Sequence, residues 1–139
     1  MLRCRTDRAG AKEPSARILV VDDDAGTRAV LAEMLSRLGY QVHEAPDGLS
    51  VSTALQAGDF SFDVVVLDWK MPGLDGLSVL EQLRTFAPES SAILISIAAD
   101  DQLRIEALSL GAFAVLRKPV RFEALVSLVE RALQHRGGG

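Results

Sequence analysis

The sequence predicts an α/β protein in which a doubly wound, five-stranded parallel sheet is covered by helices on both faces. Short apolar runs and amphipathic stretches alternate five times along the chain, as in repeated strand–helix units. Three or four of the runs are apolar throughout, which is typical of strands buried on both faces of a parallel sheet. Right-handed crossovers between such strands place helices on both sides of the sheet.

Strands are expected where the apolar runs fall. The first run is β-branched in three of its four positions and ends abruptly in three aspartates, and the second run is weaker. The third is apolar in every position, and the fourth is interrupted only by Ser96. The five expected strands span residues 18–21, 40–44, 64–67, 93–97 and 113–116.

Helices are expected between and after these strands, because apolar residues recur there at intervals of three and four. Gly39 and Gly111 each follow such a stretch, and glycine is common immediately after the C-terminus of a helix. The expected helical stretches include residues 30–38, 51–55, 77–83, 103–110 and 125–133. Among doubly wound sheets we favour the flavodoxin-like (βα)5 arrangement with strand order 2-1-3-4-5.

Composition narrows the function classes. The net charge of −4 and pI of about 5.1 argue against nucleic acid as a direct partner, because phosphate contacts need a basic surface. Cys4 is the only cysteine, so no intramolecular disulfide can form. No apolar run approaches the roughly 20 residues that span a bilayer, and residues 1–15 lack the apolar centre of a secretory signal. We therefore expect a cytoplasmic protein with no membrane partner.

The length of 139 residues indicates one domain. Residues 1–16 are rich in charged and small residues, and we interpret them as a flexible leader or linker. The chain closes on three glycines, which suggests a flexible tail over 136–139. The folded domain is expected to span 17–135.

Polar residues follow four of the expected strands. In open parallel sheets, ligands bind beyond the carboxyl ends of the strands, at the point where the strand order reverses. Asp22 and Asp23 end the first strand and Asp68 ends the third, while Ser96 and Lys118 lie near the ends of the fourth and fifth. We therefore expect these side chains to gather at one edge of the sheet.

The acidic residues predict a metal site. Asp24 is best explained as a helix N-cap, because a helix begins directly after it and Thr27 lies three residues on. Asp22 and Asp23 are different, since two adjacent carboxylates near a third at Asp68 repel one another unless a cation binds or a pKa rises. Mg²⁺ fits best, because it takes one or two carboxylates together with water and phosphate oxygens; Mn²⁺ is a possible substitute.

The same residues suit phosphoryl transfer. A carboxylate such as Asp68 can attack phosphorus and form an aspartyl-phosphate. Lys118 and the metal would offset charge on the phosphoryl oxygens, and Ser96 could donate a hydrogen bond to one of them. Taken singly, Asp68 could be a turn residue, Ser96 an incidental strand residue and Lys118 a surface lysine. Their shared place at the strand ends favours the phosphate chemistry.

Four stretches of the chain resemble the receiver domains of two-component response regulators, of the kind found in chemotaxis regulators. The resemblance covers about residues 16–135 and rests on motifs that occur in order at expected strand ends. These motifs are ILVVDDD at 18–24, LDWKMPGLDG at 67–76, ILIS at 93–96 and Lys118-Pro119.

The resemblance implies a role for each matched residue. Asp68 would accept the phosphoryl group, and the metal ligands would be Asp22, Asp23, Asp68 and the backbone carbonyl of Lys70. Ser96 would be the switch hydroxyl, and Lys118, joined to Pro119 by a cis peptide, would contact the phosphate.

The resemblance also implies partners. The phosphoryl donor would be a phosphohistidine on a sensor histidine kinase or a phosphotransfer protein. The signal would pass to an unknown output protein or domain through the face formed by the fourth helix, fifth strand and fifth helix. Such a domain catalyses only its own phosphorylation and dephosphorylation.

Several positions depart from the family pattern, and two of them bear on phosphorylation and switching. Ile97 replaces the small residue that usually follows Ser96, and Val115 stands where a switching aromatic is frequent. Phe113, two residues before Val115, is expected on the same face of the strand. These departures keep open a second hypothesis, a receiver-like binding module that phosphorylation does not regulate.

A third hypothesis is a haloacid-dehalogenase-type phosphatase, which also uses an aspartate nucleophile, Mg²⁺ and a lysine. Such enzymes carry a second acid two residues after the nucleophile, where this chain has Lys70. The chain also leaves no room for a substrate cap domain, so this alternative ranks last.

Overall fold

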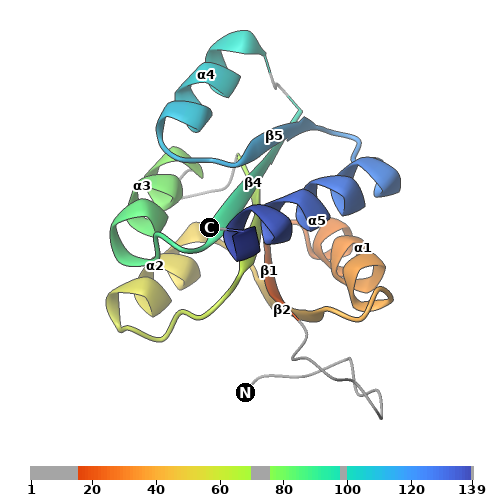
Figure 1. The fold of residues 1–139 in the computed structure, drawn as a ribbon, viewed down its shortest axis with the longest axis horizontal. Coiled ribbons are helices and arrows are strands. Elements are labelled where there is room, and N and C mark those ends of the chain that lie inside the picture. The colour runs from red at the N-terminus through yellow and green to blue at the C-terminus, as the bar shows by residue number, and fades with distance from the viewer. Residues whose placement is uncertain (1–15, 70–75, 98–99, 139) are drawn as a thin grey trace.

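The sheet has five parallel strands in the order β2-β1-β3-β4-β5, which confirms the expected fold class and strand order (Figure 1). The computed structural model describes residues 16–69, 76–97 and 100–138, with side chains to residue 135. The strands are β1 (Arg17–Val21), β2 (Gln41–Ala45), β3 (Val64–Asp68), β4 (Ser91–Ser96) and β5 (Ala114–Arg117). Each lies within one or two residues of the apolar run that predicted it.

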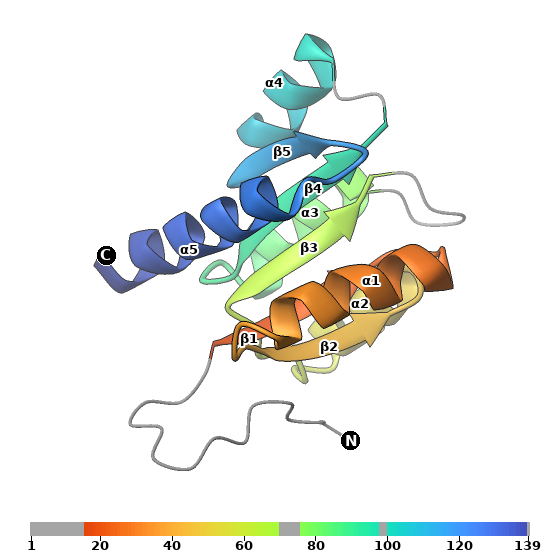
Figure 2. The ribbon, with the colours of Figure 1, turned by 90° about the vertical axis from the view of Figure 1, so that its right-hand side faces the viewer.

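Five helices cover the two faces of this sheet. They are α1 (Ala25–Ser36), α2 (Gly48–Gln56), α3 (Gly76–Phe86), α4 (Asp101–Ser109) and α5 (Phe122–Gly138). Helices α1 and α5 cover one face of the sheet, and α2, α3 and α4 cover the other (Figure 2). The buried side chains of these helices accordingly fall into two separate core clusters. Strand residues alternate between the two layers: Leu19 and Val21 face α2 and α3, whereas Ile18 and Val20 face α1 and α5.

The central strand β3 is buried along its whole length. Burial on both faces explains why its sequence, VVVLD, shows no alternation of apolar and polar residues. Asp68 is the one charged residue of this strand and its last. The sheet therefore places a carboxylate at the carboxyl end of its central strand, all of whose residues are buried.

Helix ends follow the expected signals. The Asp24 carboxylate accepts hydrogen bonds from the Thr27 backbone N–H (2.8 Å) and hydroxyl (2.6 Å), which confirms that residue as the N-cap of α1. Gly39 and Gly111 follow α1 and α4 with φ of 99° and 101°, in the left-handed region that other residues rarely adopt. These glycines turn the chain back toward the sheet.

Several boundaries differ from the expectation. Strand β4 ends at Ser96, so that Ile97 lies in a turn, and α5 continues to Gly138. Phe113 packs in the layer of α1 and α5, opposite to Val115, so the expectation of a shared face was wrong. Phe113 precedes the first residue of β5, and strict alternation holds only within a strand.

Among the described residues, no helix is both long and apolar enough to cross a bilayer.

His43 in β2 predicts a pH-dependent stability. Its ring packs edge-on against Phe62 (5.4 Å between centroids), and its buried Nε2 has no hydrogen-bond partner among the described residues. Burial lowers the pKa of His43, and the positive charge of Arg17 lowers it further. The contribution of neutral His43 to stability is therefore complete above its ordinary pKa of about 6.5, and it is lost as the pH falls through the lowered value.

We expect the melting temperature to fall by a few degrees when the pH is lowered from 7 to about 5, and to fall less in His43→Gln, which cannot be protonated. Thermal unfolding followed by circular dichroism measures this. His135→Gln is the matched control, because this histidine lies exposed on α5. Equal acid sensitivity in His43→Gln and wild type would contradict the assignment to His43.

Candidate functional site

Three carboxylates meet at the carboxyl edge of the sheet. Val21 pairs with Leu67 in the β1–β3 ladder, so Asp22 and Asp68 are the next residues in register, and Asp23 follows. One oxygen from each of Asp22, Asp23 and Asp68 lies within 4.8 Å of the others. Asp22 and Asp68 are only 2% and 6% exposed, whereas Asp23 is exposed.

Lys118 reaches this cluster from the end of β5. Its Nζ lies 3.1 Å from Asp68 Oδ1 and 3.6 Å from Asp22 Oδ2. Its backbone N–H donates to the Ser96 carbonyl (2.9 Å), which ties the segment after β5 to the end of β4. The peptide between Lys118 and Pro119 is cis, as the resemblance implied.

The charges of the cluster shift the titration of its members. Burial raises the pKa of Asp68, Lys118 lowers it and Asp22 raises it again, so that the pKa lies above its ordinary value. Burial disfavours the charged form of Lys118, yet the hydrogen bond and charge of Asp68 raise the pKa of that ammonium overall. Both shifts follow from crowding three acids around one base in a partly desolvated site.

The residues present fit a hard divalent cation. Three carboxylates against one ammonium leave an excess of two negative charges (three minus one), and carboxylate oxygens are the ligands that Mg²⁺ prefers. The fourth expected ligand, the carbonyl of Lys70, lies outside the described residues.

Ser96 lies at the same edge. It is the last residue of β4 and is buried, and its neighbour Ile95 pairs with Asp68 in the β3–β4 ladder. All the expected side chains in the described part of the chain thus come from adjacent strands at one edge.

Arg28 also contributes to the site, although the sequence pattern did not predict it. Arg28, in the first turns of α1, donates from Nη1 to the Asp22 carbonyl (2.7 Å) and from Nε to the Glu44 carboxylate (3.1 Å). Periodicity treats Arg28 as an ordinary polar residue of a helix. A signal was available in its place one turn after the acidic run, because a long side chain on a helix points back toward the preceding turn and loop.

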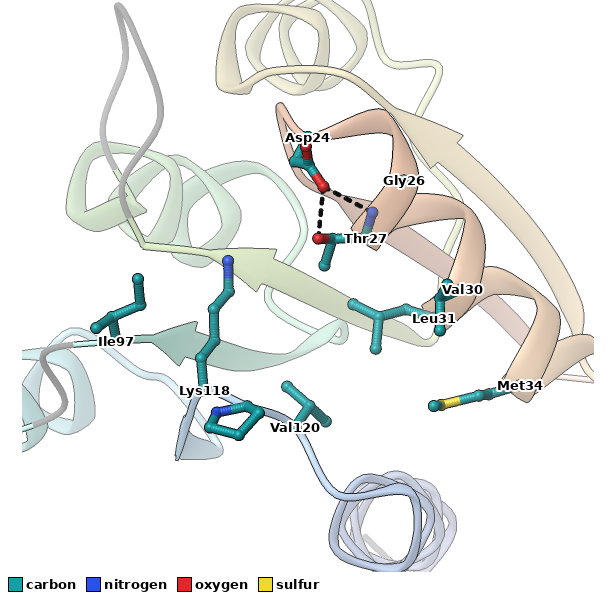
Figure 3. Close-up of a pocket in the computed structure, with 10 residues that line it drawn as sticks. Asp24, Gly26, Thr27, Val30, Leu31, Met34, Ile97, Lys118 and Val120 are labelled. Atoms are coloured by element: carbon teal, nitrogen blue, oxygen red, sulfur yellow. Dashed lines mark hydrogen bonds between the residues drawn. The ribbon is translucent and has the colours of Figure 1, made fainter.

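A groove of about 770 Å³ opens beside this site (Figure 3). Its walls are mostly apolar and come from α1 and from the segment after β5, and they include Val30, Leu31, Met34 and Val120. Lys118 stands between these side chains and Ile97, which is 77% exposed (Figure 3). The acidic cluster at the carboxyl ends of the strands is therefore bordered by an apolar surface.

This fold, with acids and a lysine at the carboxyl ends of its first, third and fifth strands, defines the class of phosphoacceptor switch domains. The model of the response regulator receiver domain family matches residues 18–130, and the chain belongs to that family. Receiver domains of this family are the phosphorylatable switches of two-component systems, bind Mg²⁺ at an acidic aspartate cluster and partner with histidine kinases.

Similar proteins include two regulators of Escherichia coli. The chain is 36% identical over 119 residues to the regulatory protein AtoC and 36% identical over 118 residues to the DNA-binding transcriptional regulator NtrC. Both alignments cover 85% of this chain but only 25% of the relative, so the chain spans about a quarter of their length. A receiver domain from Clostridium thermocellum is 30% identical with a TM-score of 0.81, over 88% of this chain and 97% of that one.

Proposed function

We propose that the chain accepts a phosphoryl group on Asp68 from a phosphohistidine of a sensor histidine kinase or a phosphotransfer protein, and thereby changes a partner-binding surface. One observation carries this proposal: the buried Asp68 carboxylate lies 3.1 Å from the Lys118 ammonium, inside a cluster of three acids. A structural ion pair would need one acid for one base. The two further acids suit a site that takes up a cation and a phosphate.

The transfer uses the chain's own groups as follows. An Asp68 oxygen attacks phosphorus, and the new O–P bond forms as the N–P bond of the phosphohistidine breaks. The bonding electron pair returns to the imidazole nitrogen, which takes a proton from solvent. Lys118 stays charged and offsets negative charge on the phosphoryl oxygens, and Ser96 supplies a hydroxyl to one of them.

Asp22, Asp23, Asp68 and the Lys70 carbonyl would hold Mg²⁺, with Mn²⁺ as a substitute. When bound, the cation supplies further charge neutralisation of the phosphoryl oxygens. The same charge compensates the repulsion among the three carboxylates, so that Asp68 can remain an ionised nucleophile despite its raised pKa.

The donor protein docks on the groove between α1 and the segment after β5. A phosphohistidine can reach Asp68 only if the donor protein also contacts the surface next to Asp68. The groove beside Lys118 forms part of that surface. Val30, Met34 and Val120 offer apolar contacts there, as in other grooves that receive a helix.

The output surface is α4, β5 and α5. Phosphorylation adds up to about two negative charges and three acceptor oxygens. When Ser96 moves toward those oxygens, it pulls on the segment of chain that leads to α4. That helix buries only Leu103 and Ala107, and its Arg104 donates to the Val115 carbonyl (3.0 Å). The phosphoryl group shifts the population between two arrangements of this face.

We further propose domain boundaries, a cellular compartment and a set of excluded activities for this chain. The receiver domain spans 17–135 and acts in the cytoplasm. The leader or linker expected over 1–16 lies, up to residue 15, outside the described residues, and α5 continues through most of the expected tail to Gly138. It is not an enzyme toward other substrates, and it makes no direct contact with nucleic acid or membrane. The binding module that ignores phosphorylation is the alternative, and the phosphatase ranks below it because Lys70 stands where the general acid is needed.

Incubation with acetyl phosphate or phosphoramidate and Mg²⁺, followed by intact-protein mass spectrometry, tests the proposal. We expect a mass increase of one phosphoryl group that EDTA prevents and that maps to Asp68. An unmodified mass with both donors and with a panel of phosphorylated histidine kinases would favour the binding module. Sustained turnover of a phosphate ester would favour the phosphatase.

Ile97 limits access of small phosphodonors to Asp68. Its exposed side chain lies at the mouth of the site, beside Lys118 (Figure 3). We expect Ile97→Ala to accelerate phosphorylation by acetyl phosphate by up to about fivefold, as for an access barrier of ~1 kcal/mol. Stopped-flow fluorescence of Trp69 measures the rate. Val30→Ala, in the same groove but on α1, is the control, and equal rates in wild type and Ile97→Ala would contradict the prediction.

A further inference from the structure

Arg28 connects three parts of the molecule at the edge of the acidic cluster. It belongs to α1, its Nη1 donates to the backbone carbonyl of Asp22 at the end of β1 (2.7 Å), and its Nε pairs with Glu44 in β2 (3.1 Å). The Arg28 side chain is only 18% exposed. Long arginine side chains seldom bury so much of themselves without a defined set of acceptors.

The hydrogen bond to Asp22 acts on the backbone between two acids. The Asp22 carbonyl belongs to the peptide that joins Asp22 to Asp23, and the orientation of this plane sets the direction in which Asp23 leaves the chain. The Asp22 N–H donates to the Ala45 carbonyl (3.2 Å), and the Asp22 carboxylate accepts from the Asp24 N–H (2.9 Å). Arg28 therefore completes the immobilisation of the segment that carries two of the three carboxylates.

Glu44 allows the positively charged Arg28 to hold this peptide beside a site that binds a metal cation. An uncompensated guanidinium next to the acids would repel a divalent ion and weaken its binding. Pairing with Glu44 neutralises the guanidinium while leaving its second N–H group on the Asp22 carbonyl. A planar fork with several donors can serve both acceptors, which the single ammonium of lysine does less well.

We propose that Arg28 is a positioning residue for the Mg²⁺ site, with Glu44 as its charge partner. It touches neither the phosphoryl group nor the cation, and it acts by holding the Asp22–Asp23 peptide. This inference rests on the proposed function, because it assigns Arg28 a role in preparing the acids that the phosphorylation reaction uses.

Titration of the whole chain with MgCl₂, followed by Trp69 fluorescence and by the rise in melting temperature, tests the inference. Groups that orient metal ligands typically contribute about tenfold or more to affinity. We expect Arg28→Lys to weaken Mg²⁺ binding about tenfold, and the phosphorylation rate to recover toward wild type at saturating Mg²⁺. Arg37→Lys is the matched control, because Arg37 follows α1 and pairs with Glu33 far from the acids.

Glu44→Gln provides a second variant that keeps an oxygen acceptor for Arg28 but removes the charge. We expect it to weaken Mg²⁺ binding also, and the loss to shrink as salt screens the uncompensated charge of the guanidinium. If Arg28→Lys fails to fold, Glu44→Gln decides the matter. Affinities equal to that of Arg37→Lys in the folded variants would overturn the inference, whereas a wild-type protein that neither binds Mg²⁺ nor accepts phosphate would overturn the proposed function itself.

Discussion

Replacing Asp68 by Asn should abolish phosphorylation completely, whichever donor is used. The amide keeps the shape of the carboxylate and an oxygen for Lys118, but it lacks the nucleophilic anion that forms the O–P bond. Asp22 and Asp23 do not substitute, because they follow β1, which is not adjacent to β4, whereas Asp68 ends β3, which pairs with β4. Phosphate incorporation from a phosphorylated kinase, read by intact mass, measures the loss.

The same substitution should leave the protein folded, and no less stable without Mg²⁺. The pKa of Asp68 is raised, so its ionised form is less favourable in the folded protein than in the unfolded chain at neutral pH. Removing the charge relieves this cost. Asp47→Asn is the matched control, since Asp47 follows β2 and caps α2, where Asn serves equally well. Phosphorylation of Asp68→Asn at the wild-type level would show that another group is the acceptor.

Replacing Lys118 by Met should slow phosphorylation by about a hundredfold or more, the usual effect of removing one charge-stabilising donor from a transition state. The ammonium is the one cationic group among the described residues that pairs directly with Asp68. Methionine keeps the length and apolar character of the stem, which lines the groove. The rate with acetyl phosphate at saturating Mg²⁺ measures the effect.

Lys118→Met should slow phosphorylation but should not weaken the binding of Mg²⁺. Removing a positive charge 3.1 Å from Asp68 and 3.6 Å from Asp22 lowers the repulsion that a divalent cation meets, so Mg²⁺ should bind as tightly as in wild type or more tightly. Arg117→Met removes the neighbouring exposed cation of β5 and should change neither quantity. A Lys118→Met protein that loses Mg²⁺ binding along with its rate would indicate a collapsed site instead.

The strand ends of the site were predictable because continuous apolar runs mark buried parallel strands. Each expected acid follows such a run, so knowledge of the strand order was enough to bring Asp22, Asp23 and Asp68 together. The same reasoning placed Lys118 at this edge from a strand far along the chain. The family resemblance added roles to these positions, and the geometry is consistent with them.

The contact of Arg28 with Glu44 was not predictable from pattern. These residues are 16 positions apart, and their meeting depends on the angle at which α1 crosses the sheet and on two side-chain conformations. Periodicity carries neither quantity. The predicted face of the Phe113 side chain was wrong for a related reason, because a residue just before a strand does not follow the alternation within that strand. Helix caps such as Asp47 were within reach of sequence rules, since Ser50 lies three residues on.

Because α4 is attached to the sheet by few contacts, it should open locally more easily than the rest of the fold. With two buried side chains and one bond to a strand carbonyl, this helix can detach or slide for a small part of the free energy that global unfolding requires. The acids and Lys118, by contrast, are fixed to the sheet, whose central strand is enclosed on both faces. A chemical event at the strand ends can thus be converted into a rearranged exterior without loosening the scaffold that made the event possible.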